Sequence, residues 1–332
     1  MSSARVVKAA LVVLGLAATA LLAGCAKSPD FFLPESPQGR SIASLGYVIF
    51  IILSVVLLAV WGILIAILIK DRHRPESQVK QTHGNIKIEI IWTAIPAVIV
   101  TVLFILTYQT MNALSLPSGS PSMNVVGHQW WWELDYGPGA FRTANEMHVP
   151  LDHEVLAMVT SVDVIHSFWV PQLDGKVDMI PGRYNKTSFV PTKVGTYLGE
   201  CSEYCGHQHG RMRFLVFVEP VDRFTAWYKN QVLPARKPSG AQATAGLQYL
   251  KTSPCAGCHT IRGEGLNAKV GPDLTHLASR TTIAAVTLKN TPENLKRWIR
   301  APQQVKPGNK MPTIPLSPKQ LDQVVAYLDQ LK

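Results

Sequence analysis

Hydrophobic residues form three long runs near the N-terminus and shorter, interrupted runs in the rest of the chain. The first run, ALVVLGLAATALL, lies within residues 5–22, and two longer runs without a charged residue cover 44–69 and 90–111. As a helix, 44–69 would be roughly 39 Å long, against a hydrocarbon core of roughly 30 Å. The pattern therefore predicts a transmembrane hairpin with helices at about 44–69 and 90–111.

The first run has the organisation of a signal peptide rather than of a fold element. Arg5 and Lys8 precede a short apolar core that ends in small residues before Cys25. Leu22-Ala23-Gly24-Cys25 resembles the lipobox of bacterial lipoproteins, which implies cleavage before Cys25 and a lipid on its thiol. We expect a lipoprotein signal peptide at 1–24 and a lipid-anchored N-terminus with the hairpin at 25–112; an uncleaved signal anchor is the alternative.

Charged residues between the two predicted helices orient the hairpin. Between residues 70 and 87 there are five basic residues against two acidic ones, Asp71 and Glu76; the basic residues are Lys70, Arg72, Arg74, Lys80 and Lys87. Basic loops stay on the cytoplasmic side of a membrane. We therefore expect a bacterial cytoplasmic membrane protein with two helices, and with everything after residue 112 on its outer, periplasmic face.

Two modules of different pattern follow the hairpin. Residues 113–230 contain short β-branched and aromatic runs, such as MNVVGHQWWW and FLVFVEP, broken by turn residues, which is typical of a β-sandwich or barrel. A linker rich in Pro, Ser, Gly and Ala covers 231–245. Residues 246–332 have helical periodicity, clearest in NLKRWIRAP and PKQLDQVVAYLDQL. The predicted fold is multidomain: a transmembrane hairpin, an all-β barrel and a small all-α domain.

The net charge of +10 is divided unevenly between the outer modules. Residues 120–220 hold 7 basic and 11 acidic residues, a net of −4, whereas 241–332 hold 12 and 5, a net of +7. This division argues against nucleic acid as a partner, because no single basic surface is indicated. Opposite signs favour docking of the two modules, which salt would weaken; two independently solvated surfaces are the alternative.

The second module contains the attachment sequence of a covalent haem. Cys255-Ala256-Gly257-Cys258-His259 places two thiols three residues apart, within reach of both porphyrin vinyl groups, and an imidazole next to them for the iron. A redox dithiol would need a βαβ context, and a zinc site would need a second Cys pair. Neither is present in the sequence, so we expect haem c held by Cys255, Cys258 and His259.

A second axial ligand must come from further along the chain. Asn309-Lys310-Met311-Pro312 supplies a thioether just before the last predicted helix, and Gly271-Pro272-Asp273-Leu274 precedes it. Both segments resemble those of the class I cytochromes c, which implies Met311 as the ligand; His276 is the competitor. His and Met ligation raises the haem potential and suits electron transfer.

Soft ligands are densest in residues 201–212, CSEYCGHQHGRM. Cys201 and Cys205 could form a disulfide on the oxidising side of a membrane. A single blue copper would need two His, one Cys and a weak Met, which would leave one Cys unused. Two metals bridged by both thiolates would use Cys201 and Cys205 together with His209, Met212 and His166, which lies 35 residues upstream.

The spacing Cys201-x-Glu203-x-Cys205-x-x-x-His209-x-x-Met212, preceded by Asp163-Val-Ile-His166-Ser, resembles subunit II of haem-copper cytochrome c oxidases. This resemblance covers about residues 41–220 and implies a cupredoxin barrel with a dinuclear copper A centre. It further implies the ligands in this sequence: His166, Cys201, the carbonyl of Glu203, Cys205, His209 and Met212. The Glu203 carboxylate would face a magnesium ion at the boundary with subunit I.

Three further residues resemble functional positions of that family. Trp130, in Gly127-His128-Gln129-Trp130-Trp131-Trp132, would pass electrons to the copper, although its neighbour Trp131 departs from the usual Tyr. Arg183 would lie near the electron path to subunit I, and Glu89 would stand at the mouth of a proton channel. Alternatively, Trp130 would only cover a hydrophobic core, and Glu89 would only reach from the helix end into the lipid headgroups.

The resemblance implies the subunit through which electrons enter a respiratory oxidase. Its partners would be oxidase subunits I and III, an electron-donating cytochrome or cytochrome bc complex, and membrane lipid. It would transfer electrons from haem c through copper to the partner that reduces O₂ to water with proton translocation, and would not be catalytic alone. A copper A nitric oxide reductase and a copper-delivery lipoprotein are the alternatives.

Overall fold

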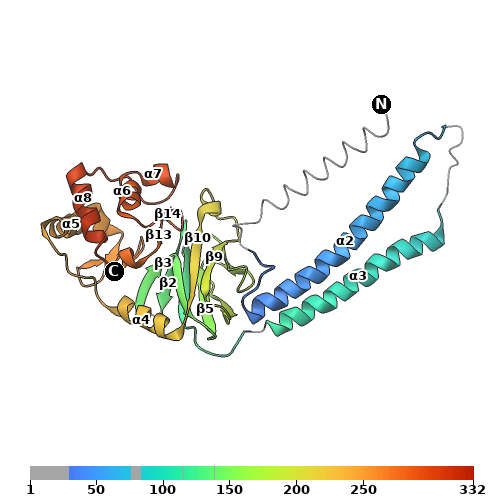
Figure 1. Cartoon of the computed structure of the whole chain (residues 1–332), viewed down its shortest axis with the longest axis horizontal. Helices are drawn as coiled ribbons and strands as arrows, with labels where there is room; N and C mark the ends of the chain where they lie inside the picture. Colours follow the sequence, from blue (N-terminus) through green and yellow to red (C-terminus); the bar gives the residue numbers. More distant parts are fainter. Residues whose placement is uncertain (1–29, 76–83, 115, 138) are drawn as a thin grey trace.

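A computed structural model describes the chain except for residues 1–29, 76–83, 115 and 138. The expected signal peptide, 1–24, and Cys25 lie outside the described residues. The described chain forms a helical hairpin, a β domain and a small helical domain, in this order (Figure 1). This arrangement confirms the predicted fold class.

The hairpin consists of α2 (Pro37–Asp71) and α3 (Ile86–Ala113). Both helices begin several residues before the predicted starts at 44 and 90, because side-chain caps fix their N-termini. Ser36 accepts a hydrogen bond from the Gly39 amide, and the Asn85 side chain accepts bonds from the amides of Lys87 and Ile88. Most apolar side chains of α2 and α3 are exposed, and both helices are long and apolar enough to cross a membrane.

The β domain packs two five-stranded sheets face to face. The first has the order β3-β2-β1-β5-β8 and the second the order β4-β10-β9-β6-β7. Their bounds are β1 Met123–His128, β2 Trp131–Tyr136, β3 Phe141–Ala144, β4 Glu146–Pro150, β5 Val155–Ser161, β6 His166–Trp169, β7 Val177–Met179, β8 Asn185–Phe189, β9 Gly195–Cys201 and β10 Arg213–Glu219. The predicted runs MNVVGH and FLVFVEP form β1 and most of β10.

Alternation of buried and partly exposed positions along these strands creates one core between the sheets. Trp132, Phe168 and Phe214 are fully buried in it and contact one another, with ring centroids 4.9–5.9 Å apart. Helix α4 (Val221–Val232) closes one end of the domain, where Trp227 packs on Tyr136 of β2. The centre of the β domain is therefore rigid and apolar.

The C-terminal domain is built mainly from short helices, as the periodicity predicted. They are α5 Ala241–Thr252, α6 Pro292–Arg300, α7 Pro302–Val305 and α8 Pro318–Leu328, with single turns at Pro254–Gly257 and Leu277–Ser279. Two small hairpins, β11 (Thr260–Ile261) with β12 (Leu266–Asn267) and β13 (Thr282–Ile283) with β14 (Leu288–Lys289), complete it. This domain lies against the β domain on the side away from the hairpin (Figure 1).

The crossing of α5 and α8 organises the helical domain. Gly246 lies where the two helices approach most closely, and a Cβ there would come within 2.0 Å of the Gln323 carbonyl oxygen. Leu247 and Leu250 of α5 pack on Val324 and Leu328 of α8 in the same buried cluster. The absence of a side chain at 246 therefore lets the two helices meet along their apolar faces.

Gly246→Ala should force α5 and α8 apart. We expect the free energy of opening of this domain to fall by about 1–3 kcal/mol from overpacking, even though alanine favours a helix by up to about 1 kcal/mol over glycine. Hydrogen exchange of the α5 and α8 amides in the solubilised chain measures this change. Gln248→Ala on the exposed face of α5 is the control, and equal protection in both variants would contradict the packing argument.

Candidate functional site

The cluster of soft ligands lies at one edge of the second sheet, in the connection between β9 and β10. Cys201 ends β9, and the loop then passes Glu203 and Cys205 before a single helical turn, His209–Arg211, leads to Met212. Strand β6 pairs with β9, with Phe168 opposite Cys201. His166, two residues before Phe168, therefore lies beside this loop although it is 35 residues away in sequence.

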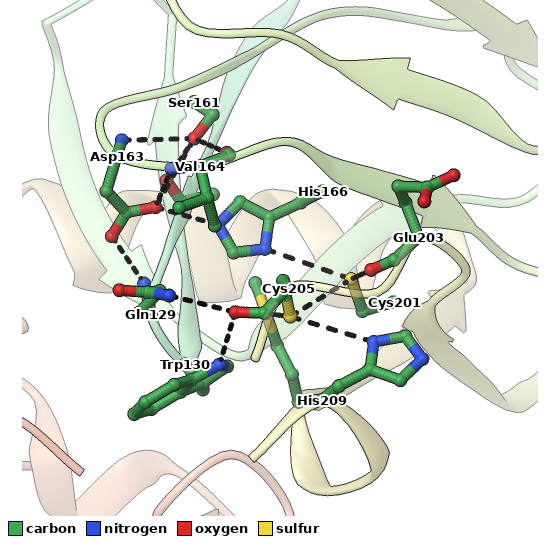
Figure 2. A network of polar contacts seen from close by, with 12 residues as sticks. Gln129, Trp130, Ser161, Asp163, Val164, His166, Cys201, Glu203, Cys205 and His209 are labelled. Atoms are coloured by element: carbon green, nitrogen blue, oxygen red, sulfur yellow. Dashed lines mark hydrogen bonds and ion pairs between the residues drawn. The ribbon is translucent and has the colours of Figure 1, made fainter. Parts of the chain in front are cut away.

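The donor atoms converge on the two sulfur atoms, which lie 3.7 Å apart (Figure 2). His166 Nδ1 is 3.8 Å and the Glu203 carbonyl oxygen 3.2 Å from Cys201 Sγ. His209 Nδ1 is 3.6 Å and Met212 Sδ 3.8 Å from Cys205 Sγ. The structure thus brings together all six predicted copper ligands in one small volume.

This arrangement fits a metal centre with bridging thiolates. Both cysteines are free and buried. Metal bonds to nitrogen and sulfur are roughly 2.0–2.3 Å long, so one ion fits between donor atoms that are 3.6–3.8 Å apart. Contact with the second sulfur lowers the pKa of the Cys201 thiol, and a hydrogen bond with His166 lowers it further. Two thiolates, two imidazoles and a thioether form a donor set suited to copper.

Asp163 holds His166 in the orientation that ligation requires. Its Oδ1 lies 2.8 Å from His166 Nε2, so Nδ1 points to the sulfur atoms. Burial alone would raise the pKa of Asp163, but hydrogen bonds with His166 and with the amides of Gln129 and Val164 outweigh burial and hold that pKa well below its usual value. Asp163 is therefore an anion that fixes the His166 ring.

Trp130 and Gln129, in the segment that joins β1 and β2 of the first sheet, contact the loop of residues 201–212, which we call the copper loop after its predicted ligands. The indole Nε1 of Trp130 donates a hydrogen bond of 3.0 Å to the Cys205 carbonyl oxygen, and Gln129 Nε2 donates one of 2.8 Å to the same oxygen (Figure 2). Trp130 is 9% exposed. The Trp130 side chain thus directly adjoins a predicted ligand residue.

The predicted haem residues line a cavity of about 520 Å³. Cys255, Cys258, His259 and Met311 all contribute to its wall. The β domain closes the remaining side with residues from the segment that includes Trp130. The cavity therefore lies between the two domains and is shared by both.

His259 has the orientation of an iron ligand. Its Nδ1 lies 2.8 Å from the Pro272 carbonyl oxygen and donates a proton to it, which leaves Nε2 as the free acceptor. Burial lowers the pKa of His259, which favours the neutral ring that iron ligation requires. A Cβ at Gly271 would come within 2.8 Å of the His259 ring, so glycine at this position leaves room for the imidazole. The donor set and the cavity fit a haem.

The two candidates for the second axial ligand are placed differently. Met311 lines the cavity. His276 is 4% exposed, does not line it, and its Nε2 is bonded to the Leu233 carbonyl oxygen 3.0 Å away. The geometry therefore favours Met311.

Three predicted functional groups, the side chains of Glu89, Arg183 and Glu203, are not brought to this site by contacts within the described chain. Glu89 lies in the first turn of α3, at the end of the hairpin farthest from the β domain (Figure 1). Arg183 is exposed and forms no ion pair with a described residue. The Glu203 carboxylate points away from the sulfur atoms, opposite to its carbonyl group (Figure 2).

Sequence reasoning assigned no role to three charged residues at or near the site: Asp163, Lys306 and Glu146. The orienting role of Asp163 could have been read from its place three residues before His166. Lys306 and Glu146 are both 2% exposed and lie between the two domains. No signal in the sequence distinguishes them, because their partners are remote in the chain.

Comparison with known proteins agrees with this arrangement. Residues 30–110 match "Cytochrome C oxidase subunit II, transmembrane domain", residues 138–219 match "Cytochrome C oxidase subunit II, periplasmic domain", and residues 243–332 match "Cytochrome c". Cytochrome c oxidase subunit 2 of Alkalihalophilus pseudofirmus is 33% identical over 95% of this chain and 94% of its own length. That of Bacillus sp. strain PS3 is 34% identical over 76% of each.

Among solved structures, the periplasmic domain of subunit II of Bradyrhizobium japonicum cytochrome oxidase is similar in sequence. It is 32% identical and covers 35% of this chain and 96% of that one, with a TM-score of 0.34. The subunit II family implies copper A, and the cytochrome c domain implies haem. The chain therefore belongs to the family of cytochrome c oxidase subunit II, a subunit of an oxidoreductase complex, and carries a cytochrome c domain at its C-terminal end.

Proposed function

We propose that this chain is the subunit through which electrons enter a respiratory haem-copper oxidase. The bound haem and copper would supply one-electron carriers, held by Cys255, Cys258, His259 and Met311 and by the six ligands around Cys201 and Cys205. Electrons would leave for subunit I, where O₂ is reduced to water. The main observation in support is that the haem donors and the copper donors lie on opposite sides of one domain interface, with Trp130 between them.

The residues of this chain would position the two centres and exclude water. Trp130 lines the haem cavity and donates to the Cys205 carbonyl oxygen, so its indole spans the gap between the two sites. Met212 and Cys205 are 0% and 3% exposed. Such burial supports electron transfer over copper delivery, because a delivery site must exchange its metal with a partner.

The remaining roles follow from the family resemblance. Subunit III, an electron-donating cytochrome or bc complex and lipid would be further partners. The Glu203 carboxylate would contribute to a magnesium site, Arg183 would lie near the path to subunit I, and Glu89 would serve proton uptake. The outer domains would face the periplasm, with a lipid on Cys25.

Metal analysis of the purified full-length chain tests the proposal. We expect two coppers for each covalent haem and an EPR signal of one unpaired electron shared over both coppers. One copper or none, with Cys201 bonded to Cys205, would contradict it and leave a membrane-bound cytochrome c.

Cys205→Ser should remove a bridging ligand while it leaves the haem site intact. We expect the haem to remain reducible, copper binding to be lost, and O₂ consumption by the assembled complex to stop. Oxygen-electrode assays and haem absorbance measure the two effects. Ser202→Ala in the same loop is the control, and unchanged turnover of Cys205→Ser would exclude the copper assignment.

Asp163→Asn should loosen the copper site without removing a ligand. Loss of a partner that orients a ligating His typically costs about 10–100-fold in metal affinity, and we expect a loss of this size. Competition with a copper chelator measures the affinity. Asp178→Asn, at an exposed position of β7, should bind copper as the wild type does. An affinity of Asp163→Asn equal to that of this control would exclude the orienting role.

A further inference from the structure

Lys306 is a buried cation at the interface between the two outer domains. It follows α7 of the haem domain and is 2% exposed. Its Nζ donates hydrogen bonds to the carbonyl oxygens of Trp130 at 2.8 Å, Arg211 at 2.9 Å and Ala284 at 3.4 Å. The first two oxygens belong to the β domain and the third to the haem domain.

A lysine is rarely buried so completely without a carboxylate. No described carboxylate lies within ion-pair distance of Lys306. Burial, together with the charge of Arg211, lowers the pKa of its ammonium to about 7. The three carbonyl oxygens match the three N–H donors of the ammonium. The charge is therefore accommodated only while the two domains are together.

The bonds of Lys306 lead directly to the copper loop. Trp130, whose carbonyl accepts from Lys306, donates its indole N–H to the Cys205 carbonyl oxygen. Arg211, the second acceptor, immediately precedes Met212. One ammonium of the haem domain thus contacts the residues that adjoin two of the predicted copper ligands.

The β domain contributes the reciprocal charge. Glu146 of β4 is 2% exposed, and its carboxylate accepts hydrogen bonds from the amide and hydroxyl groups of Thr281 and Thr282 in the haem domain, at 2.7–3.0 Å. Hydrogen bonds to a charged group contribute more than those between neutral groups. Each domain therefore carries a buried charge whose hydrogen-bond partners come mainly from the other domain.

The backbone around Lys306 is shaped to fit this contact. The Arg211 guanidinium donates to the Val305 carbonyl oxygen and the Gln208 side-chain amide to that of Pro307, while Lys306 donates to the Arg211 carbonyl oxygen in the opposite direction. The turn that presents Ala284 has positive φ at three residues, 55° at Ala284, 56° at Ala285 and 63° at Val286. Such strain at residues other than glycine persists only where surrounding contacts hold it.

We propose that Lys306 is a positioning residue that locks the haem domain onto the copper loop and holds Trp130 between the two centres. The effect on electron transfer rests on the proposed function, because Lys306 would fix the distance between the haem and the copper centre. Loss of the ammonium would leave the Trp130 and Arg211 carbonyl oxygens buried without a donor. The interface would then open or shift.

Lys306→Met in the full-length chain tests the lock, because methionine has similar length and no charge. At pH 6, below the pKa of Lys306, we expect both cofactors to stay bound, electron transfer from haem to copper to slow by about tenfold or more, and the copper reduction potential to fall because a nearby positive charge is lost. We also expect faster hydrogen exchange in 207–211 and 305–310.

Lys319→Met is the matched control, since Lys319 is exposed on α8 and its ammonium forms no hydrogen bond or ion pair with a described residue. Equal exchange, potential and transfer rate in the two variants would overturn the proposal. Glu146→Gln provides a second test from the other domain and should also speed exchange at the interface. If the wild type bound no copper, the proposed function would be wrong. Hydrogen exchange needs no metal, so it would still test whether Lys306 holds the two domains together.

Discussion

The relation between the two outer domains depends on the burial of two charges at their interface. Removing Glu146 and Lys306 from water is costly unless polar groups replace the lost hydration. Amides and hydroxyls of the haem domain surround the carboxylate, and carbonyl oxygens, two of them from the β domain, surround the ammonium. Since a small displacement would leave both charges unsatisfied, this requirement favours a single arrangement of the domains over a range of loose ones.

That arrangement gives the two predicted cofactor sites a common wall. The Cys205 carbonyl oxygen accepts from both Gln129 and Trp130, and Trp130 also lines the haem cavity. The copper loop is thereby fixed from three sides: by β6 through His166, by β1 and β2 through the segment that joins them, and by the haem domain. Rigid placement of this kind is what a centre with closely spaced ligands requires.

The parts of the structure that could be predicted are those in which nearby residues act together. The haem motif and the 201–212 loop carry their ligands at fixed spacings, and the helical periodicity of 294–302 and 318–331 matches α6 and α8. The interface could not be predicted in this way. The charge division suggested attraction between opposite surfaces, but the only direct ion pair across the interface among the described residues joins Asp163 to the exposed Lys310. The buried contacts join charges to backbone groups, which no charge count reveals.

The connection between the domains has a consequence for the kinetics of electron delivery. Only residues 233–240 lie between α4 and α5, a stretch that can span at most about 28 Å. Such a short tether keeps the haem domain at an effective concentration on the order of millimolar near its docking surface. In the proposed role, transfer from the haem to the copper centre would be a first-order step, whose rate constant would not depend on the concentration of the donor that reduces the haem.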